Sequence, residues 1–306
     1  MLHFIVNPSA RSGLGKAVWK KTERRLKEKH ADYRIHFTTH PKHATDIVSE
    51  LTGDGLCHTL VVLGGDGSMD EVVNGIRYPG KVTLGYIPVG SGNDFARGLG
   101  LAGDSMQALD SVLNPTVIRS LDLGNINMSG NAHRFAVSAG IGYDADICHK
   151  VAASGLKKLL NKIHLGKLAY VGMALDRLIY CKPAEMTITL DDTKTLHFKR
   201  TYFAAAMNLR FEGGGCMFCP NALPDDSYLD LIVVADVSKL RALITILPTV
   251  FSGKHVHMKG VHIYRCKRAD ISSSLALPVH SDGEPIPPLK KISFSAVPDF
   301  VRVIVR

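Results

Sequence analysis

Residues 60–75 have the sequence Leu-Val-Val-Leu-Gly-Gly-Asp-Gly-Ser-Met-Asp-Glu-Val-Val-Asn-Gly, and this stretch decides the fold. The apolar run Leu60–Leu63 is typical of a buried parallel strand. It leads into glycines around Asp66, and glycine allows the backbone to approach a phosphate closely. Ser68 and Glu71 have the spacing of a capping box and predict that a helix begins there. Because a helix N-terminus offers free N–H groups and partial positive charge, we expect a phosphate-binding loop.

A second glycine loop, Gly90–Arg97, follows the predicted strand 82–88. Two such loops at neighbouring strand ends form a floor for a polyphosphate, although neither matches the P-loop or the dinucleotide-binding fingerprint. Asp66 is placed to hold Mg²⁺ against the phosphates. Lys16 and Arg97 are further candidates for phosphate contact. We predict that the nucleotide lies against Gly65, Asp66, Gly67, Ser68, Met69, Asp70, Glu71 and Ser91.

Strands and helices alternate through the first third of the chain, which predicts a parallel sheet with ligands at the carboxyl ends of its strands. The predicted elements there are strands 3–6, 33–37, 60–63 and 82–88 and helices 16–29 and 68–76. Strands dominate afterwards, at 119–123, 133–139, 185–190, 195–207, 228–235, 260–271 and 291–306, with helical stretches at 143–180 and 238–252. We therefore expect an α/β domain over residues 1–120 and a β-rich antiparallel sandwich over 121–306, with the last ten or so residues returning to the first domain.

Length and composition fit two globular domains. The chain has 306 residues, of which 45% are hydrophobic and 21% charged, which excludes a mostly disordered protein. The N-terminus lacks the features of a signal peptide, and no apolar stretch is long enough to span a membrane, so we expect a cytoplasmic protein. The six cysteines are expected to be reduced and structural. Cys216 and Cys219 have C-x-x-C spacing, but no second pair completes a zinc site.

The formal net charge of +9 favours an anionic partner, although it also serves solubility. No helix-turn-helix, zinc-finger or RRM signature points to nucleic acid. The segment Lys157–Leu168 mixes lysines with leucine and isoleucine. Such a segment is either a helix lying on an anionic membrane or an ordinary core-facing helix with a solvated basic side.

The glycine loops resemble those of the diacylglycerol kinase catalytic-domain family, which includes soluble bacterial diacylglycerol kinases and the sphingosine and ceramide kinases. The resemblance rests on Gly64–Gly75 and Gly90–Arg97 and covers nearly the whole chain. It implies an ATP- and Mg²⁺-dependent kinase that phosphorylates a membrane lipid, foremost diacylglycerol to phosphatidic acid. The segment Asn7–Gly13 resembles the family's first nucleotide loop, and Thr39 lies where the family has a nucleotide-contacting threonine. The implied contacts are Asn7, Pro8, Ser9 and Thr39.

The second half carries the resemblance further. The segment Asn208–Asp230 is similar to one that holds a structural Mg²⁺ in bacterial members. It implies three ligands: the Asp226 carboxylate and the carbonyls of Leu223 and Tyr228. The segment His280–Glu284 resembles the family's D-G-E segment, which implies that Asp282 is the general base.

Two residues depart from the family pattern. Asp70 stands where the family usually has asparagine, and Ser227 replaces a glycine in the metal segment. A kinase of the NAD kinase family, which shares the GGDG loop and a similar two-domain plan, is one alternative. A non-catalytic relative that keeps the fold, for which Asp70 is the hint, is another. The resemblance implies peripheral contact with an anionic membrane surface and leaves a homodimer open.

Overall fold

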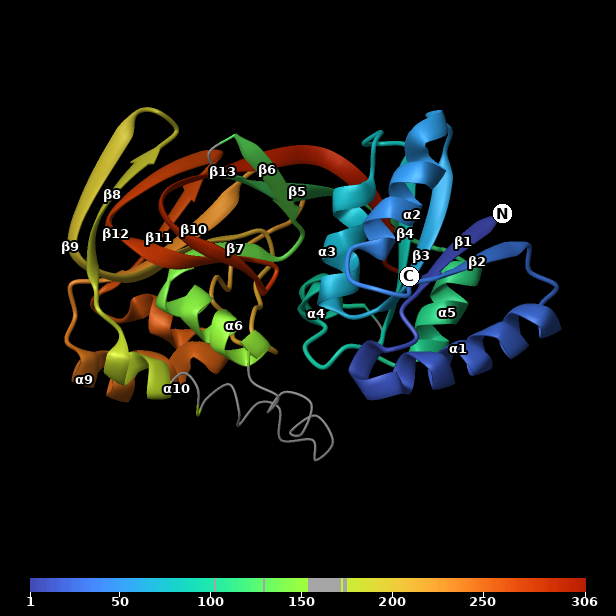
Figure 1. The fold of residues 1–306 in the computed structure, drawn as a ribbon, viewed down its shortest axis with the longest axis horizontal. Coiled ribbons are helices and arrows are strands. Elements are labelled where there is room, and N and C mark those ends of the chain that lie inside the picture. Colours follow the sequence, from blue (N-terminus) through green and yellow to red (C-terminus); the bar gives the residue numbers. More distant parts are fainter. Residues whose placement is uncertain (102, 129, 154–171, 173–174) are drawn as a thin grey trace. The chain divides into compact units, whose positions relative to one another are not determined.

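In the computed structural model, which describes residues 1–101, 103–128, 130–153, 172 and 175–306, the chain forms two compact units (Figure 1). The first comprises Met1–Asp122 and Pro298–Arg306, and the second Leu123–Val297. The chain passes from one unit to the other within strand β5 (Ile118–Met128) and returns within strand β13 (Glu284–Ile304).

The first unit contains a sheet whose described pairings are all parallel, in the order β13-β4-β3-β1-β2. Its elements are β1 (Leu2–Val6), α1 (Ala10–Glu28), β2 (Tyr33–Phe37), α2 (His43–Leu51), η1 (Thr52–Asp54), β3 (His58–Gly64), α3 (Asp66–Gly75), β4 (Val82–Pro88), α4 (Asp94–Leu99) and α5 (Ser105–Leu113). Parallel strands present their carboxyl ends at one edge, so the loops after β1, β3 and β4 lie together.

Helices cover the sheet of the first unit. Apolar residues of α1 and α5, among them Trp19, Leu26 and Leu109, pack against Phe4 and Val61 of the strands. On α3, Gly75 lies so close to α2 that a Cβ there would be 2.6 Å from the Thr45 carbonyl oxygen. The run Leu60–Leu63 is fully buried, as predicted.

The second unit is built from antiparallel pairings. Besides parts of β5 and β13 it contains β6 (Asn131–Phe135), β7 (Ser138–Gly142), α6 (Tyr143–Ala153), β8 (Ala184–Leu190), β9 (Lys194–Met207), β10 (Leu229–Ala235), α9 (Lys239–Arg241), η2 (Ala242–Ile246), α10 (Leu247–Thr249), η3 (Val250–Ser252), η4 (Lys254–His257), β11 (Val261–Cys266) and β12 (Arg268–Ser281). Of the predicted helix 143–180, the structure describes residues 143–153, 172 and 175–180, and these are helical; the remaining residues lie outside the described ones.

Strand β10 of the second unit is apolar on both faces. In β10, Leu231 and Val233 join one core cluster, whereas Ile232 and Val234 join another. The second cluster also includes Ala242 and Ile246 of the helical segment. Since successive side chains of a strand point to opposite faces, β10 is covered on one face by other strands and on the other by the helical segment.

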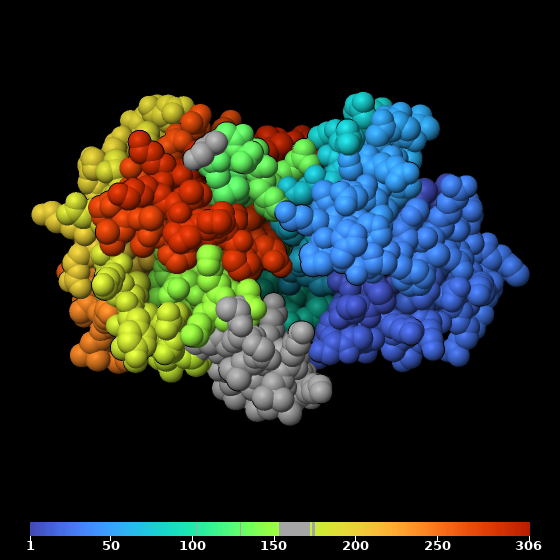
Figure 2. All heavy atoms as spheres, viewed as in Figure 1, coloured from blue at the N-terminus to red at the C-terminus, as the bar shows by residue number. Residues whose placement is uncertain are grey.

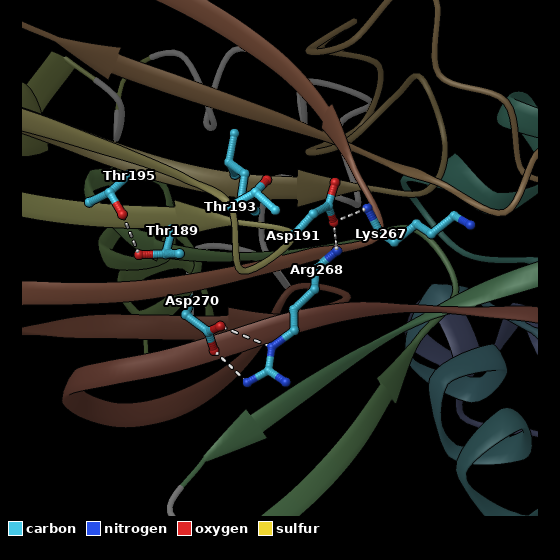
Figure 3. A network of polar contacts seen from close by, with 8 residues as sticks. Thr189, Asp191, Thr193, Thr195, Lys267, Arg268 and Asp270 are labelled. Atoms are coloured by element: carbon cyan, nitrogen blue, oxygen red, sulfur yellow. Dashed lines mark hydrogen bonds and ion pairs between the residues drawn. The ribbon is translucent and has the colours of Figure 1, made fainter.

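The β8–β9 hairpin illustrates how tertiary contacts set a strand boundary (Figure 3). Asp191 and Asp192, in the loop 191–193, have φ of 48° and 56°, as the two central residues of a type I′ turn require, and the Thr193 N–H donates to the Leu190 carbonyl oxygen at 3.0 Å. Asp191 Oδ1 accepts hydrogen bonds from the backbone N–H groups of Lys267 and Arg268, both at 2.8 Å. The predicted single strand 260–271 is therefore wrong: the chain breaks at Lys267 between β11 and β12.

The predicted strand 133–139 is also two strands, β6 and β7. The N–H groups of Ala136 and Val137 between them donate to the Asp282 carboxylate instead of to a neighbouring strand. The predicted strand 119–123 extends to Met128, and the predicted strand 291–306 begins earlier, at Glu284.

Candidate functional site

The two glycine loops of the first unit pack backbone against backbone. A Cβ on Gly65 would lie 3.0 Å from the Gly90 Cα, and a Cβ on Gly90 would lie 2.7 Å from the Gly65 Cα. The Val89 N–H donates to the Gly64 carbonyl at 2.8 Å. Only glycine permits this approach, so the loops after β3 and β4 form one continuous backbone surface.

Helix α3 begins at Asp66, with Gly65 as an extended N-cap residue that makes no side-chain capping bond. The N–H groups of Ser68 and Met69 already donate to the Gly65 carbonyl oxygen. The N–H donors that the first turn offers to a phosphate are therefore those of Gly65, Asp66 and Gly67, because an α-helix leaves its first N–H groups without intrahelical partners.

The predicted capping box between Ser68 and Glu71 is wrong. Glu71 Oε2 accepts a hydrogen bond from the N–H of Ala44, 3.1 Å away, in the first turn of α2. The Thr45 hydroxyl donates to the Glu71 carbonyl oxygen at 2.9 Å. Glu71 thus joins α2 to α3, and the start of α3 is set by Gly65.

Asp66 is half-buried at the start of α3. Its Oδ1 accepts a hydrogen bond from the N–H of Phe95, 3.1 Å away, in the first turn of α4. Burial raises the pKa of Asp66, and hydrogen bonds from the N–H groups of Phe95, Asp94 and Asn93 partly oppose that shift. A bound divalent cation would stabilise the ionised carboxylate that burial disfavours, so this position fits the chemistry of a metal-bound phosphate.

The first loop is tied to the glycine loop. The Asn7 side-chain amide donates to the Ser68 hydroxyl at 3.2 Å, and its oxygen accepts the Ser9 N–H at 3.0 Å. A Cβ on Gly15 would lie 2.1 Å from the Asn7 carbonyl oxygen, so α1 can approach this loop only at a glycine. The structure therefore brings Asn7, Ser9 and Ser68 together.

Other predicted nucleotide contacts are placed differently. Met69 and Asp70 are buried, with 1% and 5% of their surface exposed, and the Asn74 amide contacts Asp70 Oδ1 at 3.3 Å. Thr39 and Ser91 are exposed, and the Thr39 N–H donates to the ring of His43. The side chains of Met69 and Asp70 are thus part of α3's packing.

The two candidate phosphate cations, Lys16 and Arg97, differ in their contacts. Lys16 is exposed on α1. The Arg97 guanidinium forms an ion pair with Asp94 and donates to the Gly92 carbonyl oxygen at 3.1 Å. Arg97 therefore holds the second glycine loop in shape.

Asp282 lies in a turn of the second unit, where three N–H groups bind its carboxylate. Oδ1 accepts from Val137 and Ser138 at 2.8 and 3.0 Å, and Oδ2 accepts from Ala136 at 2.7 Å. In return, the Asp282 N–H donates to the Ser138 carbonyl oxygen at 2.8 Å. The residue has φ of 46°. The sequence did not predict this anchoring role, which joins segments far apart in the chain.

An apolar pocket of about 110 Å³ lies within the second unit, between the sheet and its helices. Its apolar walls include Phe203, Ile232, Ala242 and Ile246 together with other residues of α6 and the helical segment. Asp144 and Glu212 also line the pocket and supply a polar region in an otherwise apolar wall.

Behind these two carboxylates lies a buried imidazole that sequence analysis missed. His280 Nε2 contacts Asp144 Oδ2 at 2.8 Å and Glu212 Oε1 at 3.4 Å. Burial alone would lower the pKa of His280, but the charges of Glu212 and Asp144 outweigh it and raise the pKa to about 9. His280 and Asp144 are 136 residues apart, and no local spacing could have paired them.

In the predicted metal segment, the cation beside Asp226 is the guanidinium of Arg265. Asp226 Oδ2 pairs with the Arg265 guanidinium at 2.7 Å, and Oδ1 accepts the Tyr228 N–H at 3.0 Å. The guanidinium also lies over the Tyr228 ring, 4.5 Å from its centroid. This donor set does not fit the predicted Mg²⁺, because a metal ion would have to displace Arg265 from the carboxylate.

We expect Asp226→Ala to lower the melting temperature by about 2–4 °C, because the turn loses its N–H acceptor and a partly exposed ion pair. EDTA should leave the wild-type melting temperature unchanged, since Arg265 already neutralises Asp226. Differential scanning calorimetry with and without EDTA checks both. A stability loss in EDTA that is absent in Asp226→Ala would restore the structural metal.

The chain matches two family models. Residues 1–126 match the diacylglycerol kinase catalytic domain, and residues 137–305 match the YegS C-terminal NAD kinase beta sandwich-like domain. It is 31% identical over 287 residues to the Bacillus subtilis protein named "Putative lipid kinase YtlR", with 92% of each chain covered. The chain belongs to the diacylglycerol kinase catalytic-domain family. It is a lipid kinase.

Further relatives agree with this family. A diacylglycerol kinase of Bacillus subtilis is 29% identical, with 92% of this chain and 88% of that protein covered. A solved structure from Bacillus anthracis, described as a "putative diacylglycerol kinase", has a TM-score of 0.76 and 23% identity, and covers 100% of this chain and 96% of that one. This structural likeness supports the fold.

The helices of this chain were compared with the length and apolarity that a membrane-spanning helix needs. Among the helices that the structure describes, none is long and apolar enough to cross a bilayer. The basic segment Lys157–Leu168, for which the sequence left a membrane contact or a core-facing helix open, lies wholly outside the described residues.

Because His280 forms a buried ion pair with Asp144 and Glu212, we expect the folding stability of this lipid kinase to fall at alkaline pH. The folded-state pKa of His280 is raised to about 9. The ion pair therefore contributes fully to the free energy of unfolding below pH 6.5, the ordinary pKa of histidine, and this contribution is lost as pH rises through 9. We expect a loss on the order of 2–4 kcal/mol between these pH values. Urea unfolding across this range measures it, with His257→Gln, at an exposed position, as the control.

The assignment to His280 is tested by its own signal. The His280 ring resonances in NMR should titrate near pH 9 in the folded wild type. A midpoint below 6.5 would contradict the ion pair.

Proposed function

We propose that this lipid kinase transfers the γ-phosphoryl group of ATP to the hydroxyl of diacylglycerol and forms phosphatidic acid. The apolar pocket of the second unit carries the proposal, because its wall suits an acyl chain and its carboxylates suit a hydroxyl donor. The nicotinamide dinucleotide that an NAD kinase phosphorylates is polar and charged, and this lining would not solvate it.

The first unit would bind ATP through the backbone of the paired loops. The N–H groups of Gly65, Asp66 and Gly67 are donors for phosphate oxygens, and Asn7 and Ser68 hold the first loop beside them. Mg²⁺ held by Asp66 would neutralise charge on the transferred phosphoryl group. Contacts from Pro8, Ser9, Thr39, Ser91 and Glu71 remain part of the proposal.

Asp282 is the proposed general base, because its carboxylate is fixed in position by the N–H groups of Ala136, Val137 and Ser138. The lipid oxygen forms a bond to the γ-phosphorus as the bond to the β–γ bridging oxygen breaks. The hydroxyl proton goes to Asp282, and ADP leaves. We further propose a cytoplasmic protein that reaches its substrate peripherally at an anionic membrane.

Labelled ATP supplied with diacylglycerol, ceramide, a sphingoid base or NAD tests the acceptor. We expect label in phosphatidic acid and none in NADP. Ala242→Phe, which fills the pocket, should raise KM for the lipid and leave KM for ATP unchanged. Leu275→Phe, at a position of the same unit that is 44% exposed and does not line the pocket, is the control. Equal rates for Ala242→Phe and the wild type, or labelled NADP, would overturn the proposal.

A further inference from the structure

The helical segment Lys239–Ser252 is apolar on two opposite sides. On its inner side Ala242, Ile246 and Val250 are buried and line the apolar pocket. On its outer side Leu240 and Ile244 are 66% and 62% exposed. A helix that is apolar all round is found where both sides are removed from water, and here only the inner side is.

A second helical segment extends the apolar outer side. The Lys239 ammonium donates to the Ile179 carbonyl oxygen at 2.6 Å, which places residues 175–180 beside α9. Ile179 and Tyr180 are 69% and 67% exposed. Figures 1 and 2 show the two segments, yellow-green and orange, side by side on the surface of the second unit. We call this surface the outer face, which consists of Leu175, Ile179, Tyr180, Leu240, Ile244 and Phe251.

Basic residues predominate around the outer face, and Asp176, which lies on the second segment, is paired with Arg177 at 2.9 Å. Residues 237–269 contain no aspartate or glutamate in the sequence, whereas Lys239, Arg241, Lys254 and Lys259 lie within this stretch. Apolar side chains with a basic surround are typical of surfaces that lie in the interface of an anionic bilayer. A second copy of the chain would bring the same positive charge against this face and be repelled.

The structure also connects the outer face to the lipid pocket. The same helical segment lines the pocket with one side and exposes the other, so seating its outer side in a bilayer brings the pocket wall to the membrane. We infer that the outer face docks this kinase on anionic membranes, with Leu240 and Ile244 inserted among the acyl chains. The inference rests on the proposed function, because a membrane lipid is its substrate.

Vesicle sedimentation tests the docking surface directly. The vesicles are phosphatidylcholine alone or phosphatidylcholine mixed with phosphatidylglycerol. We expect binding to the anionic vesicles that weakens with salt, and about tenfold or greater weakening in a Leu240→Gln, Ile244→Gln double variant. Arg241→Gln should weaken binding about fivefold at low salt. Leu56→Gln, at a position 65% exposed in the other unit, is the matched control and should bind as the wild type does.

The depth of insertion has its own readout. Leu240→Trp should be quenched by brominated acyl chains, whereas Leu56→Trp should not; the natural Trp19 is buried and gives the background. Wild-type binding by the double variant, or equal binding to neutral and anionic vesicles, would overturn the inference.

Activity on detergent-dispersed short-chain diacylglycerol separates this inference from the proposed function. The double variant should retain this activity, because Leu240 and Ile244 do not line the pocket. If the wild type and the variant both fail to phosphorylate the dispersed lipid, the proposed substrate is wrong, while the vesicle result still decides the docking surface.

Discussion

Asp66→Asn should lower kcat/KM by on the order of 10³-fold while the folded protein becomes no less stable. The variant loses the negative charge proposed to hold Mg²⁺ against the phosphates, a contribution of several kcal/mol. It keeps an oxygen that accepts the Phe95 N–H, so the link between the glycine loops survives.

The expected stability follows from the sign of the pKa shift. Burial raises the pKa of Asp66, so the ionised carboxylate costs folding free energy at neutral pH. A neutral amide avoids this cost, and the melting temperature should stay equal or rise by about 1–3 °C. Asp66→Ala also loses the hydrogen bond to Phe95 and should be less stable than Asp66→Asn.

Initial rates over a range of Mg²⁺ and calorimetric melting measure both effects. Asp46→Asn, at an exposed position on the neighbouring helix α2, is the control and should change neither. Near-normal turnover by folded Asp66→Asn would remove Asp66 from the proposed nucleotide site.

Asp282→Asn should lower kcat by about 10²–10⁴-fold with ATP affinity largely retained, because the variant cannot accept the hydroxyl proton. The structure adds a second expected effect. If the amide oxygen of the new asparagine accepts from Val137 and Ser138, its NH₂ group lies opposite the Ala136 N–H. Two donors then face each other, and the Ala136 N–H loses its acceptor. Stability should fall by about 1–3 kcal/mol.

A matched variant separates these effects. Asp191→Ala removes the carboxylate of another aspartate with positive φ in the same unit, and with it the acceptor of two backbone N–H groups. It should lose stability and keep kcat. Rates are measured at a temperature at which both variants are folded, and ATP affinity by calorimetry.

The pH profile of the residual activity identifies the role of Asp282. Loss of the acidic limb of the kcat profile is expected if the carboxylate is the base. An unchanged profile with reduced kcat would make Asp282 a positioning residue for Ala136–Ser138, and the base would have to be sought elsewhere.

The sequence alone determined the features that depend on local chemistry. The apolar run Leu60–Leu63 and the glycines around Asp66 indicated a buried strand followed by a glycine turn and a helix. The alternation of strands and helices, followed by consecutive strands, indicated the two kinds of domain. Hydrophobic periodicity and glycine conformation act over a few residues, so a single chain displays them without its fold.

Only the tertiary structure decided how side chains are used. Glu71 has the spacing of a capping residue, yet it accepts from Ala44 on another helix. Asp282 binds the backbone of Ala136–Ser138, and Asp191 breaks a predicted strand at Lys267. A carboxylate forms hydrogen bonds with whichever donors the fold brings within about 3 Å, and those donors lie far away in sequence.

The pocket's polar region shows the same limit most clearly. His280 lies in strand β12, where apolar and polar residues alternate in the sequence. Nothing in that local pattern distinguishes it from any other polar residue of a half-buried strand. Its partners Asp144 and Glu212 come from other segments of the second unit. Sequence spacing fixes which face of a strand a residue occupies, but the packing of strands and helices fixes what lies opposite it, and that packing set the charge state of this imidazole.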